Sequence, residues 1–75
     1  MRYKCWRARD NLTHVIVVDG AFDEIPDRIK GLGPWVGSKD GEVERLKPHY
    51  RKLLADQGFV VVHQHVSKFA PEADR

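Results

Sequence analysis

Two histidines near the C-terminal end of the chain are the side chains best suited to bind a metal ion. His63 and His65 are two residues apart, so in a β-strand both imidazoles point to the same face. Such a pair can share a transition metal, and Cys5 or His14 could supply a further ligand through a tertiary contact. No CxxC or HExxH motif supports the pair. We therefore expect a strand end that enters solvent, with a metal site on His63, His65 and Cys5 as an alternative.

The single cysteine could act as a nucleophile if a histidine base and an orienting aspartate lay beside it. Nothing in the sequence places such groups near Cys5, and a lone cysteine in a strand usually behaves as a small apolar side chain. One cysteine also excludes an internal disulfide framework and is typical of a reducing compartment. We therefore expect no catalytic residues, no cofactor and a cytoplasmic location.

A basic segment at the N-terminus combines cations with an aromatic ring, as sites for single-stranded nucleic acid do. The residues are Arg2, Lys4, Trp6, Arg7 and Arg9. The segment holds few aromatic rings, however, and basic residues on an edge strand also protect a sheet from aggregation. The net charge of +2 falls short of the basic stripe of a dedicated nucleic-acid binder. Nucleic-acid binding by this strand is therefore an alternative to protein binding.

The strongest structural pattern lies between Gly41 and Val66. Apolar side chains recur there three or four residues apart, as along one side of a helix: Val43, Leu46, Tyr50, Leu53 and Leu54. Pro48 is favourable at a first helical position, which predicts a main helix from 47 or 48 to 57, after a separate turn over 42–46. Gly58 ends the helix, and an apolar strand follows over 59–66.

Two strands and a short helix precede this unit. Residues 1–9 and 13–18 predict a hairpin, and the second of these strands is apolar on both faces, which favours a central position or a second covering layer. A short helix with Ile25 and Ile29 facing inward follows and ends at Gly31. The glycine-rich segment 31–41 is then interpreted as a loop that Trp35 pins to the edge of the core.

The element order β-β-α-α-β predicts a small two-layer α+β domain over residues 1–68, with a three-stranded sheet and helices packed on one face. Residues 69–75 are expected to form a polar C-terminal tail. The strands are expected to follow chain order across the sheet, and the crossover into the last strand favours a parallel pair. At 75 residues, one core is only marginally sufficient.

A sheet covered on one side leaves an apolar face or edge that recruits a partner, and a homodimer is the simplest one. We therefore expect a small non-enzymatic interaction module that self-associates through its sheet. A chain this short rarely closes a substrate pocket, which counts against an enzyme. No apolar run approaches the roughly 20 residues that span a bilayer, so we expect no membrane partner.

Overall fold

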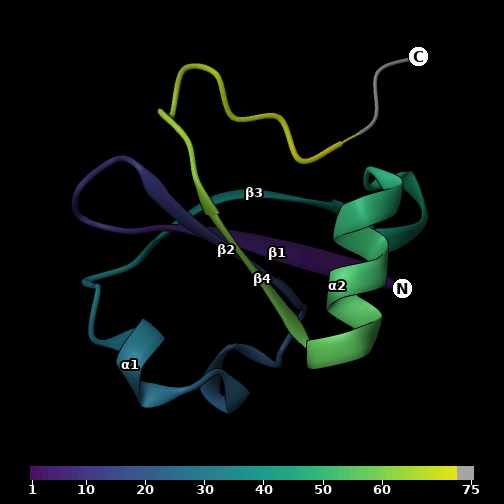
Figure 1. The fold of residues 1–75 in the computed structure, drawn as a ribbon, viewed down its shortest axis with the longest axis horizontal. Coiled ribbons are helices and arrows are strands. Elements are labelled where there is room, and N and C mark those ends of the chain that lie inside the picture. The colour runs from purple at the N-terminus through teal and green to yellow at the C-terminus, as the bar shows by residue number, and fades with distance from the viewer. Residues whose placement is uncertain (73–75) are drawn as a thin grey trace.

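Four antiparallel strands form the sheet in a computed structural model that describes residues 1–72 (Figure 1). The strands are β1 (Arg2–Arg7), β2 (Thr13–Val18), β3 (Val36–Glu42) and β4 (Phe59–His63), in the order β3-β1-β2-β4. The helices are α1 (Asp27–Lys30) and α2 (Pro48–Gln57), and 3₁₀ turns cover Phe22–Glu24 and Val43–Arg45. The α+β class and the β1–β2 hairpin are thus as predicted, and β2 has a neighbour on each side.

The predicted three-stranded sheet is wrong, because the glycine-rich segment contains a fourth strand. β3 pairs with β1, yet most of its side chains are exposed. A strand held by its backbone and facing solvent has no apolar alternation, which is the pattern that identifies strands in a sequence. The predicted separate turn before Pro48 is present as the second 3₁₀ turn.

β4 is antiparallel to β2, whereas a parallel pair was predicted, and the extra strand explains the difference. β3 and β2 are both antiparallel to β1, so β3 returns the chain to the end of the sheet where β2 finishes. The ten residues of α2 extend about 15 Å, close to the width of three strand spacings. α2 therefore carries the chain from one edge of the sheet to the other, and β4 starts beside the end of β2.

The helix α2 packs on one face of the sheet and forms what we call the α2 core. Its buried residues are Tyr3, Cys5, Ile16, Leu46, Tyr50, Leu54 and Val60. Pro48 occupies the first turn, and Gly58 ends the helix with a φ of 84°, a left-handed conformation that favours glycine. Leu53 was expected to face inward as well, but it is 39% exposed, because around the helix axis it lies on the side of Tyr50 away from Leu54, at the margin of the buried face.

The opposite face is covered by the segment that contains α1, so the prediction that the helices share one face is wrong. This α1 core buries Val15, Val17, Ile25 and Ile29 and is flanked by Trp6, Phe22, Trp35, Phe59 and Val61. Figure 1 shows α1 and α2 on opposite sides of the strands. The apolar residues on both faces of β2 require cover on both, and a short aromatic-rich segment is enough to provide it.

The chain after β4 folds back over the α2 core. The Phe69 ring stacks on His14 with the ring centroids 4.1 Å apart, and Pro71 is fully buried. The Tyr3 hydroxyl donates to Glu72 Oε1 at 2.8 Å. Residues 69–72 of the predicted polar tail therefore pack against the domain, and 73–75 lie outside the described residues. None of the helices within 1–72 is long and apolar enough to span a membrane.

Candidate functional site

The structure does not gather the basic N-terminal residues on one surface. Their strand, β1, lies between β3 and β2 and is not an edge. Arg2 donates to Asp40 and Glu42 on β3 at 3.0 and 2.9 Å, and the Trp6 ring packs on Phe22 with the centroids 4.8 Å apart. Lys4 Nζ lies 5.7 Å from the Trp6 ring centroid. The ring is thus part of the α1 core and not a free platform for a base.

The two other basic residues point elsewhere. Arg7 follows the alternation of Tyr3 and Cys5, so it lies on the face opposite to Lys4. Arg9 lies beyond the end of β1 and is exposed. The five cationic and aromatic side chains are therefore divided between two faces and a turn.

The three residues considered for a metal site are also separated. Cys5 is fully buried in the α2 core, where burial raises the pKa of its thiol, whereas His63 lies on the α1 side of the sheet. His63 Nδ1 is 3.1 Å from Thr13 Oγ1, and His65 Nδ1 is 2.8 Å from Ser67 Oγ. In the described part of the chain, no three His, Cys, Asp or Glu side chains are grouped to hold a metal ion.

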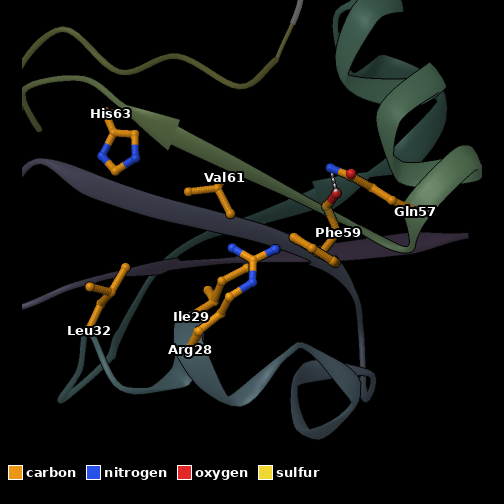
Figure 2. A pocket seen from close by; sticks show the side chains of 7 residues that line it. All are labelled: Arg28, Ile29, Leu32, Gln57, Phe59, Val61 and His63. Carbon is orange, nitrogen blue, oxygen red and sulfur yellow. Dashed lines mark hydrogen bonds between the residues drawn. The ribbon is translucent and has the colours of Figure 1, made fainter.

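A groove of about 400 Å³ runs between α1 and β4 (Figure 2). We call it the α1 groove; its lining residues are Arg28, Ile29, Leu32, Gln57, Phe59, Val61 and His63. Figure 2 shows Arg28 extending from α1 toward β4, with its guanidinium group between Val61 and Phe59. The groove is thus lined by apolar side chains of α1 and β4 together with the polar groups of Arg28, Gln57 and His63.

The strand β4 forms the outer wall of this groove, and the hydrogen-bond pattern defines which of its backbone groups are free. Gln64 N–H donates to Leu12 O at 2.9 Å, in the register that pairs Val62 with His14 and Val60 with Ile16. Bonded and non-bonded pairs alternate in an antiparallel ladder. The even-numbered residues of β4 therefore bond to β2, and the backbone groups of the odd-numbered ones point outward.

β4 therefore has three residues whose backbone N–H and C=O groups point away from β2: Phe59, Val61 and His63. Gln57 Nε2 donates to Phe59 O at 2.8 Å, which satisfies one outward carbonyl from within the chain. The side chains of all three face the α1 groove, on the same side as Arg28. In Figure 1, β4 runs in front of β1 and β2, and neither helix crosses it. The edge of β4 therefore offers backbone donors and acceptors beside an apolar groove.

The other edge of the sheet differs in composition. Val43 N–H donates to Met1 O at 2.8 Å, and the same alternation turns the backbone groups of Asp40 and Glu42 outward. The carboxylates of both residues pair with Arg2. The register with β1 shifts between Cys5 and Trp6, which leaves Ser38 as an extra residue. Charges, glycines and a bulge thus occupy the β3 edge.

A second hollow of about 320 Å³ lies at the end of α2 and is lined by Met1, Val18, Val43, Arg51, Leu54 and Ala55. It is apolar except for Arg51. None of its lining residues lies in an edge strand, so this hollow has no row of free backbone N–H and C=O groups beside it. We therefore take the β4 edge with the α1 groove as the candidate site.

Sequence reasoning identified His63 and the strand itself, but not the groove residues Arg28, Leu32 and Gln57. The available signal was the uncharged run from Phe59 to Val62, since such a run is an aggregation risk if it forms an edge. No protein-family model matches the chain, and no curated protein or solved structure is significantly similar to it.

Proposed function

We propose that this chain is a small, non-enzymatic protein-interaction module that binds an extended segment along the outer edge of β4. The observation that supports this most directly is the run of three outward-facing backbone positions, at Phe59, Val61 and His63, beside an apolar groove. Strand addition to a free sheet edge is a recurrent mode of peptide recognition, in which backbone bonds supply affinity and flanking pockets supply specificity.

The groove gives the proposed site a preference for certain side chains. A strand added to β4 places every second side chain on the groove face, next to Phe59, Val61 or His63. Ile29 and Leu32 contribute apolar surface there, so β-branched residues at those positions bury area against the module. The Arg28 guanidinium favours an acidic residue on the groove face of the added strand.

A designed peptide tests this function without knowledge of the natural partner. The probe is a labelled, acetylated and amidated seven-residue peptide, Glu-Thr-Val-Thr-Val-Thr-Glu, in which both Val and both Glu side chains lie on the same face of the strand. We expect saturable binding to the wild-type protein, on the order of 10–100 μM, because the interface is small. The same peptide with alternate amides N-methylated should not bind, because it lacks the donors that face β4.

Val61→Pro and Asp40→Pro form a matched pair for this experiment. Each removes an outward N–H from one edge strand, and proline is tolerated at such positions because that N–H is not used in the protein's own ladder. We expect V61P to weaken peptide binding at least about tenfold and D40P to leave it unchanged. Equal binding by the two folded variants, or equal binding of the N-methylated peptide, would contradict the proposed site.

A further inference from the structure

Resting on the proposed strand-addition site, we infer that the partner strand is β4 of a second copy of this chain, paired antiparallel across a two-fold axis through Val61. The outward positions Phe59, Val61 and His63 are centred on Val61, which makes the edge self-complementary. An axis at Val61 pairs the two Val61 residues with each other, and it pairs Phe59 of each copy with His63 of the other. All six outward positions then have partners.

Other registers use the edge less well. A shift of two residues in one direction places His63 of one copy opposite Gln57 of the other, which is in α2. The same shift in the other direction places Phe59 opposite His65, which lies beyond the strand. A shift of one residue places outward backbone groups opposite groups already bonded to β2, because bonded positions alternate. A parallel pairing is not related by a two-fold axis and does not close. The symmetric antiparallel register is therefore favoured.

Side chains on the groove face support the same register. The two Val61 side chains meet at the axis, and β-branched pairs are favourable across strands. Phe59 of one copy faces the His63 imidazole of the other, so neither position pairs like charges. Because Phe59 and Val61 also line the α1 groove, the two grooves join across the axis into one channel, which holds the Arg28 side chain of each copy as well as apolar surface.

Pairing has an identifiable cost in each copy. Gln57 Nε2 must release Phe59 O before that carbonyl can accept from the second copy. Five-residue strands also bury an area at the low end of specific interfaces, below about 1,200 Å². We therefore expect a reversible dimer with a Kd on the order of 10 μM, and Gln57→Ala should tighten it several-fold by removing the competing donor.

Disulfide trapping tests the position of the axis. Directly bonded antiparallel partners have Cα atoms about 5.5 Å apart, within the range that a disulfide spans. V61C should therefore form a covalent dimer under mild oxidation. F59C and H63C alone should not, whereas the F59C/H63C double variant should. Native Cys5 is fully buried and serves as the wild-type background, which should stay reduced and monomeric on a denaturing gel.

Sedimentation equilibrium of the wild-type chain from about 5 to 500 μM completes the test, with a dimer expected at the upper end and a shift to monomer in V61P. Cross-linking of F59C as efficient as that of V61C would overturn the axis at Val61. Monomeric wild type at all concentrations, with the designed peptide still bound, would overturn the second copy as partner but leave the strand-addition site standing. Failure of peptide binding as well would remove both.

Discussion

The two edges of this sheet have opposite chemistry. The β3 edge is charged, carries Gly37 and Gly41, and is interrupted by a bulge, all of which oppose pairing with another chain. The β4 edge is a run of Phe and Val with a regular register to β2 and no charge before His63. The β3 edge therefore has several features that oppose strand addition, whereas the β4 edge has the Gln57 side chain, the Arg28 guanidinium beside the groove and the terminal His63.

The difference follows from what each strand does for the core. Val60 and Val62 pack with the α2 core, and Phe59 and Val61 pack with the α1 core, so β4 needs apolar residues at successive positions. β3 contributes no residue to either buried cluster and is free to carry Lys39, Asp40 and Glu42. An edge strand that serves two cores has no position left for a protective charge. The absence of a protective charge from Phe59 to Val62 is therefore a direct result of the fold.

The largest effect that separates the two edges is expected in stability. Val60→Ala removes two methyl groups from a fully packed site and should lower the free energy of unfolding by about 2 kcal/mol. Val36→Ala, the same change at a residue that is 53% exposed on β3, should alter it by less than about 0.5 kcal/mol. Urea unfolding of the two variants measures both values. Equal destabilisation would show that β3 serves the core as much as β4 does.

Acid should weaken the β4 side of the sheet before the β3 side. His14 pairs with Val62 of β4, is fully buried, and its Nε2 has no hydrogen-bond partner within residues 1–72. Burial lowers the pKa of His14 from its ordinary value of 6.5, and the nearby Arg7 charge adds to this, while the Leu12 carbonyl and Asp10 oppose it. Below about pH 6.5 the unfolded chain therefore binds a proton that the folded chain does not, and stability falls until the folded pKa is reached.

Thermal unfolding between pH 7.5 and 5 checks this prediction. The Tm of the wild type should fall over this range, and that of His14→Phe, which keeps a ring against Phe69, should fall less. Hydrogen-exchange protection should be lost first in β4. An identical pH profile for wild type and H14F would show that another group causes the loss.

The smallest effect is expected from the ion pairs of the β3 edge. Arg2→Ala removes the bonds to Asp40 and Glu42, where both carboxylates hold the Arg2 pKa above its ordinary value. All three side chains are largely exposed, so the Tm should fall by less than about 5 °C, and 0.5 M salt should reduce the difference further. A larger, salt-independent fall would mean that these pairs, and not backbone bonding, hold β3 in the sheet.

Local signals in the sequence predicted the parts of the fold that depend on few neighbours. Pro48 and Gly58 mark the ends of α2 correctly, and the apolar residues of β2 identify a strand with neighbours on both sides. β3 was missed because its partners in β1 lie between 29 and 40 positions away along the chain, and no local pattern encodes that pairing. That omission also reversed the direction of β4 and hid the arrangement of the two edges.

The candidate site was predictable only in part for the same reason. The uncharged run of β4 is visible in the sequence, but which of its backbone groups point outward depends on the register with β2. Arg28 and Leu32 reach the groove because α1 lies on the face opposite to α2, and this placement was predicted incorrectly. The Trp6 strand was singled out by composition, yet tertiary packing on Phe22 engages its ring.

Amide hydrogen exchange at Val61 tests the contrast between the edges most directly. Its N–H points away from β2, as that of Asp40 on β3 points away from β1. We predict that both amides exchange rapidly at about 10 μM protein, and that at about 1 mM exchange at Val61 slows about sevenfold, as a Kd near 10 μM implies, while Asp40 is unchanged. Exchange at Val61 that stays rapid at the higher concentration, or slows equally at Asp40, would contradict a β4 edge that is selectively open to a second strand.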